Sequence, residues 1–353
     1  MPHACLKVDL MVNKLQKNLD TFLNEKFSQS EADQRLVMVI NAIAESVKQV
    51  AKMVETAPLA GQLGKLDNEN VQGEQQAKLD LLTNDCFVAN LQACDAVAGI
   101  VSEELGEAIL LSKDASKPNY LAVFDPLDGS SNIEVNVAVG SIFSILKAPV
   151  GRATQVADFL VKGTEQVLAG YAIYGPSTIL VFTFGTGVQC FTLDRTRDKV
   201  SGDFVLTNDN MRVPEETQEF AINASNARFW EPPIQQYISE CQAGATGARG
   251  KDFNMRWIAS MVADVHRVLM RGGVYLYPKD NKLPLKAGRL RLLYELNPMS
   301  WIVEQAGGKS STGRERVLEL VPTEIHQRAP IIIGSKNEVE RINLYYQDFD
   351  KSH

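Results

Sequence analysis

The sequence lacks several features that would define a class of protein. No apolar run approaches the roughly 18 residues that a membrane-spanning helix needs. The N-terminus, M-P-H-A-C-L-K-V-D-L-M-V-N-K, has neither the long apolar core nor the small-residue cleavage site of a signal peptide. The five cysteines are odd in number and show no C-x-x-C spacing, which indicates neither a disulfide framework nor a zinc site. We therefore expect a cytoplasmic, soluble protein with reduced thiols and no membrane association.

Positive charge and histidine are also scarce. Lys and Arg number 36 against 43 Asp and Glu, a formal net charge of −7, whereas a nucleic-acid-binding surface should be basic. A local cluster of Arg and Lys could still bind an anionic substrate. The four histidines form no H-E-x-x-H motif or triad pattern. We expect no nucleic-acid partner and no catalysis by imidazole.

The 353 residues are enough for two domains, and their patterns mix helices with strands. The predicted helices cover residues 33–55, 75–93, 254–270 and 297–306. The predicted strands lie at 97–102, 120–124, within 135–147 and 166–193, and at 290–294 and 331–333. Residues 56–74 are predicted to form a long mobile or functional loop. The charged stretch 194–214 is predicted to be a domain junction, and the whole is predicted to be a layered α/β or α+β fold.

Two glycine-containing stretches resemble nucleotide-binding motifs. Gly307-Gly308-Lys309-Ser310 lacks the earlier glycine of a P-loop, because that position is Val303. We interpret it as a turn that ends a helix. The stretch 185–187, Gly-Thr-Gly, lacks the third glycine of a dinucleotide-binding fingerprint and is predicted to be a hairpin turn.

Carboxylates follow three predicted strands. They are Glu103 and Glu104, Asp125 and Asp128, and Glu295. Converging carboxylates cannot all stay ionised without a partner. Oxygen ligands without His or Cys favour a hard cation, Mg²⁺ or Mn²⁺. Because Mg²⁺ is typically bound by a few carboxylates together with phosphate oxygens, a phosphorylated substrate is predicted.

The stretch 124–132, F-D-P-L-D-G-S-S-N, combines metal-ligating and phosphate-binding groups. Pro126 makes the turn rigid, and the Leu127 carbonyl is a further hard ligand. Gly129 lets the backbone approach an anion, and the N–H groups and hydroxyls of Ser130 and Ser131 can bind phosphate oxygens.

This pattern is similar to the lithium-sensitive, metal-dependent phosphomonoesterases, whose hallmark is D-P-x-D-G-[ST]. Among them, the chain resembles the class 1 fructose-1,6-bisphosphatases over nearly its whole length. The matching stretches are G-E-Q-Q-A-K-L-D (73–80), V-S-E-E (101–104), F-D-P-L-D-G-S-S-N-I (124–133), S-M-V-A-D-V-H-R (260–267), G-G-V-Y-L-Y-P (272–278) and L-R-L-L-Y-E-L-N-P-M (290–299).

The resemblance implies a five-layer α-β-α-β-α subunit in a homotetramer. Residues 1–211 would form an N-terminal domain with most metal ligands, and residues 212–353 a C-terminal sugar-phosphate-binding domain. The implied reaction is hydrolysis of the 1-phosphate of fructose-1,6-bisphosphate, with two or three Mg²⁺ ions per subunit.

The resemblance also implies a role for each matching residue. The metal ligands would be Glu103, Asp125, the Leu127 carbonyl, Asp128 and Glu295. Asp80 and Glu104 would orient and deprotonate the attacking water. The substrate contacts would be Asp128, Gly129, Ser130, Ser131, Asn223, Arg256, Trp257, Tyr275, Tyr277, Arg289 and Arg291, with Arg256 crossing a subunit boundary. Glu74 would approach a metal when the long loop closes.

Some positions depart from the family pattern. Trp257 and Asn226 stand where tyrosines are usual, and Arg289 replaces a lysine. The segment 280–287 is longer than in animal members, which leaves Lys282 and Lys286 as alternatives for one contact. The G-T-G-E-L-T stretch that binds AMP in animal members is not found, and Asn119 and Lys147 replace its basic partners. AMP inhibition therefore stays open.

Alternative functions also remain open. Sedoheptulose-1,7-bisphosphate could be a substrate alone or in addition, because it shares the 1-phosphate. An inositol monophosphatase would not need Arg256, Tyr277 and Arg289. A non-catalytic relative that binds a sugar phosphate would be expected to have lost a ligand, and none of the seven metal and water-activating positions is lost. The preferred metal, and a gluconeogenic or carbon-fixing role, are likewise open.

Overall fold

The computed structural model describes residues 17–27, 30–61, 64–69, 75–196, 202–282 and 287–352, and of residues 65–69 and 75–77 the backbone only. Within these ranges, none of the helices combines the length and the apolar character needed to cross a membrane. The cysteines described, Cys86, Cys94, Cys190 and Cys241, are buried free thiols.

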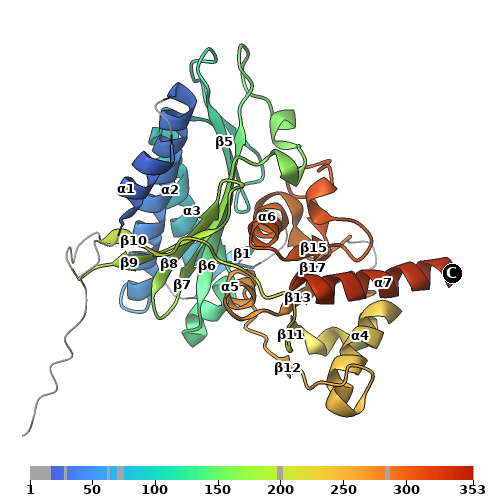
Figure 1. Ribbon diagram of the computed structural model, residues 1–353. Coiled ribbons are helices and arrows are strands. Elements are labelled where there is room, and N and C mark those ends of the chain that lie inside the picture. Colours follow the sequence, from blue (N-terminus) through green and yellow to red (C-terminus); the bar gives the residue numbers. More distant parts are fainter. Residues whose placement is uncertain are drawn as a thin grey trace, which may run out of the picture.

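The first two layers are formed by the N-terminal part of the chain (Figure 1). The outer helices are α1 (Leu19–Lys26), α2 (Glu31–Thr56) and α3 (Lys78–Ala93). The sheet beneath them has the order β10 (Asp203–Asn208), β9 (Gln189–Asp194), β8 (Thr178–Thr183), β7 (Leu168–Tyr174), β6 (Val139–Lys147), β5 (Tyr120–Asp128), β3 (Val97–Ser102) and β4 (Ile109–Leu110). Its neighbours pair antiparallel except β3 and β5, which are parallel.

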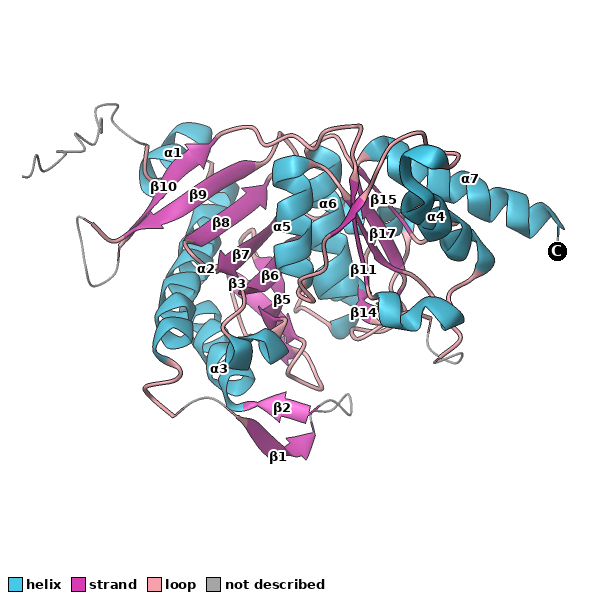
Figure 2. Cartoon of the chain, turned by 90° about the horizontal axis from the view of Figure 1, so that it is seen from below, coloured by secondary structure: helices cyan, strands magenta, loops and turns pink. Residues whose placement is uncertain are grey.

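The remaining three layers come from the C-terminal part (Figure 2). Helices α5 (Met261–Arg271) and α6 (Asn297–Gln305) lie between the large sheet and a second sheet. The second sheet has the order β12 (Asn254–Met255), β11 (Glu219–Ile222), β13 (Val274–Tyr277), β17 (Ile331–Gly334) and β15 (Lys309–Ser311). Helices α4 (Pro232–Ala243) and α7 (Lys336–Ser352) cover its far face. The predicted five-layer α-β-α-β-α fold is confirmed.

Two short ribbons complete the structure. In the first, β1 (Lys65–Glu69) pairs with β2 (Gln75–Ala77) beside α3. In the second, β14 (Leu290–Arg291) pairs with β16 (Arg328–Ala329). The first ribbon corrects two predictions: residues 56–74 are not all loop, and the helix predicted from residue 75 begins at Lys78.

Helix α2 forms where its apolar periodicity predicted it. The Ser30 hydroxyl caps its first turn by accepting from the N–H of Asp33 at 3.2 Å. Its buried face includes Leu36, Ile43 and Val47, which belong to the core between the helical layer and the large sheet. The strands predicted at 97–102 and 331–333 and the helix at 297–306 are also confirmed. The predicted turns at 185–187 and after α6 are found as well, the latter with Gly307 at a φ of 92°.

Three predicted boundaries near the site are wrong. Strand β5 does not end at residue 124 but continues, with an irregular register, to Asp128. Residues 292–296 form a π-helical turn, so only Leu290–Arg291 is strand. The helix predicted from residue 254 starts at Met261, because residues 254–255 pair with β11 and Ala259 has a φ of 67°. Arg256 is therefore not in its first turn.

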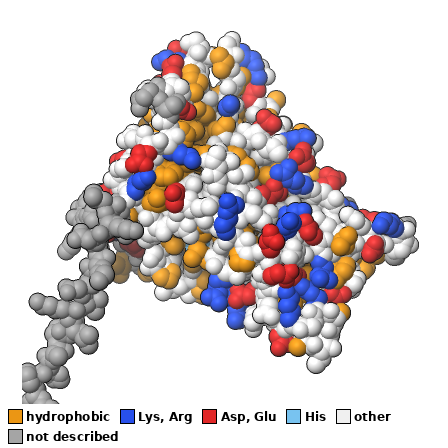
Figure 3. Space-filling view, viewed as in Figure 1, with side chains coloured by type: hydrophobic (Ala, Val, Ile, Leu, Met, Phe, Trp, Pro, Cys, Tyr) orange, Lys and Arg blue, Asp and Glu red, His pale blue; other side chains and the backbone are white. Residues whose placement is uncertain are grey.

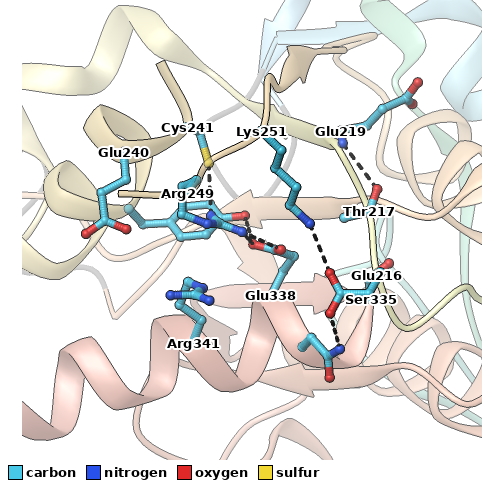
Figure 4. A network of polar contacts seen from close by, with 12 residues as sticks. Glu216, Thr217, Glu219, Glu240, Cys241, Arg249, Lys251, Ser335, Glu338 and Arg341 are labelled. Carbon is cyan, nitrogen blue, oxygen red and sulfur yellow. Dashed lines mark hydrogen bonds and ion pairs between the residues drawn. The ribbon is translucent and has the colours of Figure 1, made fainter. Parts of the chain in front are cut away.

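A buried ion pair joins helices α4 and α7 to the segment that leads to β12 (Figure 4). Arg249 Nη2 donates to both carboxylate oxygens of Glu338 at 2.6 and 2.8 Å. The hydroxyl of Tyr237, from α4, donates to the same carboxylate at 2.8 Å. The pair therefore joins α4, the start of α7 and the segment that leads to β12.

Charges of both signs mix on the molecular surface. In Figure 3, Lys and Arg side chains alternate with Asp and Glu side chains over the half that holds the C-terminus. The electrostatic field of this face is therefore not of one sign.

The predicted junction at 194–214 contains β10, which is the last strand of the first sheet. The next strand along the chain, β11, belongs to the second sheet.

Candidate active site

The carboxylates predicted from the sequence line one cavity of about 350 Å³. It lies where β3, β5 and the π-helical turn 292–296 meet. The lining residues are Asp80, Glu103, Glu104, Asp125, Leu127, Asp128, Gly129, Ser130, Ser131, Tyr277, Arg289, Leu290, Arg291, Glu295 and Arg328.

Three of the carboxylates are close enough to share an ion. Asp125, Asp128 and Glu295 are buried, and each offers an oxygen within 4.8 Å of the others. Glu103 follows β3, and its N–H donates to the carbonyl of Phe124 at 3.1 Å. Because β3 and β5 are parallel, their carboxyl ends meet at one edge and bring Glu103 next to Asp125. Two strands and one helical turn therefore supply the acids, not three strand ends.

Burial and mutual repulsion make these acids hard to ionise. The pKa of Asp125 is raised well above its usual value, first by burial and then by Glu103, Asp128 and Glu295. Burial and Glu103 raise the pKa of Glu295 in the same way, although Arg291 opposes the shift. A divalent cation would remove the repulsion, and oxygen donors alone suit Mg²⁺ or Mn²⁺. The residues present therefore fit such an ion.

The N-terminus of α5 holds Asp128 in place. Oδ2 of Asp128 accepts from the Ser260 hydroxyl at 2.7 Å and from the N–H of Val262 at 2.9 Å. These donors lower the pKa of Asp128, but burial raises it more. Helix N-termini favour negative charge, so α5 fixes one acid of the cluster and partly stabilises its ionised form.

The turn after β5 needs its glycine. Gly129 has a φ of 75°, and a Cβ there would lie 2.6 Å from Cβ of Ser260. The next residue, Ser130, donates its hydroxyl to Oδ2 of Asp80 at 3.4 Å. The turn therefore approaches both α5 and the predicted water-activating Asp80 of α3.

Arg291 lines the cavity and contacts two of the acids. Its side chain is only 2% exposed, and its Nη2 lies 3.6 Å from Oε1 of Glu103. Its backbone N–H donates to Oε2 of Glu295, and its Nη1 donates to the carbonyl of Arg289 at 3.1 Å. A buried arginine beside a carboxylate cluster can balance its charge and also bind a phosphate.

Not every predicted substrate contact lines the cavity. Trp257 lies outside the lining and stacks on Tyr275, with ring centroids 5.8 Å apart. Tyr275 is buried behind Tyr277, which does line the cavity. Asn223 caps a short 3-10 helix by accepting from the N–H of Ser225, and the half-exposed Arg256 faces Glu219 at 4.0 Å. Their predicted roles stay predictions.

Some predictions fall elsewhere in the structure. Glu74 and Lys286 lie outside the described residues, whereas Lys282 is exposed. Asn119 is buried, and its amide oxygen accepts from the guanidinium of Arg35, which comes from α2. The prediction about AMP is not tested by this arrangement.

The cavity also contains a basic residue that the sequence did not reveal. Arg328 lines it, and β14–β16 pairing places Arg328 directly opposite Arg291. Its Nη1 donates to the carbonyl of Arg289 at 2.7 Å. With Arg289 and Arg291, it makes three arginines around a cluster of acids. The Q-R-A-P stretch carries no recognisable signal for this, because the pairing is long-range.

Both parts of the chain match models of the same protein family. Residues 18–209 match the family model described as Fructose-1-6-bisphosphatase, N-terminal domain, and residues 213–347 match the model for its C-terminal domain. The chain belongs to the fructose-1,6-bisphosphatase family.

Individual relatives agree with this family membership. A class 1 fructose-1,6-bisphosphatase from Halorhodospira halophila is 55% identical over 322 residues, 90% of this chain and 94% of the relative. One from Hydrogenophilus thermoluteolus is 55% identical over 88% of this chain and 86% of its own length. The crystal structure of Leishmania major fructose-1,6-bisphosphatase in holo form has a TM-score of 0.85 and 36% identity, covering 95% of this chain and 100% of that one. Membership of the fructose-1,6-bisphosphatase family implies dependence on a divalent metal, which the acidic cluster fits.

Proposed function

We propose that this chain hydrolyses the 1-phosphate of fructose-1,6-bisphosphate, giving fructose-6-phosphate and phosphate. The observation that carries the proposal is the cavity in which Asp125, Asp128 and Glu295 approach within 4.8 Å beside three arginines. Acids alone would repel a phosphate, and arginines alone would bind it without activating it. Together, the two kinds of residue suit a phosphate ester that is held by acid-bound metal ions and by arginines.

Glu103, Asp125, Asp128, Glu295 and the Leu127 carbonyl would hold two or three Mg²⁺ ions, with Mn²⁺ as a substitute. A bound divalent ion supplies positive charge that polarises the phosphate and stabilises the departing sugar oxygen. This assignment is supported by the raised pKa values of Asp125 and Glu295, which favour a cation in their midst.

The remaining lining residues would activate the attacking water and bind the phosphate. Glu104 takes the proton of the attacking water, and Asp80 orients that water. The backbone of the turn at Gly129, the hydroxyls of Ser130 and Ser131, and the Arg291 guanidinium bind the transferred phosphate. Arg328 and Arg289 lie on the same wall and add positive charge at the phosphate.

Residues farther from the acids would bind the other end of the substrate. Tyr277 at the cavity and Trp257 behind it belong to one aromatic group, with centroids 6.0 Å apart. The indole N–H of Trp257 can still donate where a tyrosine hydroxyl is usual. Asn223 and Arg256 would contact the distal phosphate, Arg256 from a neighbouring subunit of a homotetramer. Glu74 would approach a metal as its loop closes.

The proposal includes a cytoplasmic location and two domains, 1–211 and 212–353. Sedoheptulose-1,7-bisphosphate is the main alternative substrate, because the 1-phosphate site would serve both sugars. Inositol-1-phosphate would leave the Arg289 and Tyr277 side of the cavity without a partner. A regulatory relative that only binds a sugar phosphate would not need Glu104 and Asp80 in the same cavity as the acids.

Phosphate release tests the proposal. The purified full-length chain is assayed with fructose-1,6-bisphosphate, sedoheptulose-1,7-bisphosphate and inositol-1-phosphate, each with Mg²⁺, with Mn²⁺ and with chelator, and with or without AMP. The expected result is metal-dependent release from fructose-1,6-bisphosphate at the highest kcat/KM. Faster release from another substrate, or binding without release, would replace the proposal with the corresponding alternative.

A further inference from the structure

Arg289, which lines the cavity, is held by a carboxylate that lies outside the lining. Its Nη2 donates to Oδ1 of Asp280 at 3.2 Å and to Oδ2 of the same residue at 3.0 Å. The Asp280 side chain is 4% exposed and that of Arg289 is 22% exposed. Asp280 is therefore shielded from water and paired with one cavity residue, whereas the guanidinium keeps part of its surface accessible.

The position of the Asp280 carboxylate is fixed by its own segment. Asp280 forms an isolated antiparallel bridge with the buried Trp230, and the N–H of Asn281 donates to the carbonyl of Phe229 at 2.9 Å. Oδ1 of Asp280 also accepts from the N–H of Lys282 at 3.0 Å, which is the contact of an Asx-turn. The bridge and the turn therefore hold this carboxylate in place.

The backbone of Arg289 is fixed as well. A Cβ on the preceding residue, Gly288, would lie 2.1 Å from the carbonyl carbon of Ala329, so the two segments are in direct contact. The carbonyl of Arg289 accepts from Nη1 of Arg291 at 3.1 Å and from Nη1 of Arg328 at 2.7 Å. Since both its backbone and its guanidinium are held, the Arg289 side chain has few conformations left.

From these contacts we propose that Asp280 is a positioning residue for substrate binding. It holds the Arg289 guanidinium in the orientation that receives the sugar phosphate, on the Tyr277 side of the cavity. The inference rests on the proposed sugar-phosphate substrate and extends that proposal to a residue behind the cavity wall. An arginine that is held before binding strengthens binding, because the ligand does not have to order a flexible side chain.

The negative charge of Asp280 has an effect of the opposite sign, because it offsets the positive charge of Arg289. An unpaired guanidinium attracts a phosphate more strongly than a paired one, but it also has more rotamers to lose on binding. The positioning role predicts weaker binding of the sugar phosphate when Asp280 loses its charge. Charge compensation alone predicts tighter binding, so the sign of the change distinguishes the two effects.

Two substitutions separate the arginine contact from the turn. Asp280→Asn and Asp280→Ser both keep a side-chain oxygen that can accept from the N–H of Lys282. Both remove the ionised partner of Arg289. A change in ligand binding that is common to the two variants therefore reports the loss of the ion pair.

The protein contains a matched ion pair away from the cavity. Nη1 of Arg152 donates to Oδ2 of Asp158 at 2.9 Å, and the same oxygen accepts from the N–H of Gln155 at 2.8 Å. Asp158 thus joins an arginine to a nearby backbone N–H, as Asp280 does, and all three residues lie outside the lining of the cavity. Asp158→Asn reproduces the loss of an arginine–aspartate pair without changing Arg289.

The experiment measures the binding of fructose-6-phosphate and of inorganic phosphate to the full-length chain with Mn²⁺ by titration calorimetry, together with KM and kcat for fructose-1,6-bisphosphate. We expect both Asp280 variants to weaken fructose-6-phosphate binding and to raise KM about 2- to 10-fold, with a smaller change in kcat. Inorganic phosphate should lose less affinity, because Arg291 and the turn at Ser130 would hold it. Asp158→Asn should leave both affinities and KM unchanged.

Arg289→Met tests whether Asp280 acts through Arg289. Alone, it should weaken fructose-6-phosphate binding at least as much as Asp280→Asn does. In the Arg289→Met background, Asp280→Asn should add no further loss, because the group that it positions is absent. A further loss as large as in the wild-type background would show that Asp280 supports only the fold and would overturn the positioning role.

The remaining outcomes separate this inference from the proposed function. Unchanged or tighter fructose-6-phosphate binding in the Asp280 variants, with phosphate release by the wild-type chain, would overturn the positioning role and leave the proposed function standing. A wild-type chain that neither releases phosphate from fructose-1,6-bisphosphate nor binds fructose-6-phosphate would overturn both. If Asp280→Asn does not fold, Asp280→Ser decides, and wild-type affinity in that variant would overturn the role.

Discussion

The hydroxyl of Ser260 donates to Oδ2 of Asp128 at 2.7 Å, across 132 residues of sequence. It joins a carboxylate at the end of β5, in the first sheet, to the first turn of α5, in the middle layer. The same hydroxyl accepts from the N–H of Ala263 at 3.4 Å and caps the helix. One side chain therefore serves both the fold and the acidic cluster.

Ser260→Ala should be more destabilising than the loss of an ordinary helix cap. It removes the cap and leaves a buried carboxylate oxygen with one donor fewer, so we expect a loss of about 2 kcal/mol or more in the free energy of unfolding. Ser30→Ala, at the cap of α2, is the control and should cost about 1 kcal/mol. Urea unfolding measures both. Equal losses would mean that the contact with Asp128 contributes nothing.

Glu104→Gln should lower kcat while substrate binding persists. The amide keeps the size of the side chain but cannot accept the proton of the attacking water, so a loss of about 10²- to 10⁴-fold in kcat is expected. Glu107→Gln changes an exposed carboxylate in the same segment and should leave kcat unaltered. Steady-state phosphate release and calorimetric substrate binding give both quantities. Near-normal turnover in Glu104→Gln would remove Glu104 from the mechanism.

Asp264 should make the stability of the metal-free protein depend on pH. Its carboxylate accepts from the N–H groups of Ile258 and Ala259, but burial raises its pKa to about 7. The folded state therefore holds this proton more tightly than the unfolded state, whose pKa is near 3.8. The resulting stabilisation is complete below pH 3.8 and is lost as the pH rises through about 7.

Asp264→Asn should flatten this part of the pH dependence, because the amide does not titrate. Chemical unfolding from pH 4 to 8 in the presence of chelator measures the slope. Asp85→Asn, an exposed position on α3, should reproduce the wild-type slope. A variant at Asp264 with the wild-type slope would show that other groups cause the dependence.

Arg249→Met should be strongly destabilising. The Arg249 and Glu338 side chains are 3% and 2% exposed, so the substitution leaves a buried carboxylate without its cation and should cost about 3–5 kcal/mol. Replacing both residues with apolar ones, Arg249→Met with Glu338→Leu, should recover much of the loss. The Lys309–Glu340 pair is 45% and 41% exposed, and Lys309→Met should cost less than about 1 kcal/mol. Similar losses in the two single variants, measured by urea unfolding, would contradict a special role for burial.

Sequence patterns predicted the elements that depend on local periodicity. Strand β3 and helix α2 carry continuous apolar faces, and both were placed within two residues. The acids were also found, since Asp125 and Asp128 follow an apolar run directly. Sequence could not, however, predict how β14 pairs with β16, because the two strands are separated by more than 30 residues. Arg328 was missed for that reason.

The predicted start of α5, at residue 254, was wrong for a different physical reason. Trp257 and Ile258 continue the apolar stripe of the helix, so the pattern alone extends it toward residue 254. In the structure both residues pack on the core without being helical, and Trp257 stacks on Tyr275. The backbone N–H groups of Ile258 and Ala259 donate to the Asp264 carboxylate and not to helical carbonyls. A tertiary contact therefore overrides the periodic signal.

Anomalous diffraction from crystals of the full-length chain grown with Mn²⁺ tests the central claim most directly. The claim is that the carboxylates of Asp125, Asp128 and Glu295 bind a divalent cation. We predict a strong anomalous peak within bonding distance of oxygens from all three. A fully occupied Mn²⁺ elsewhere, with these carboxylates unbound, would contradict the account.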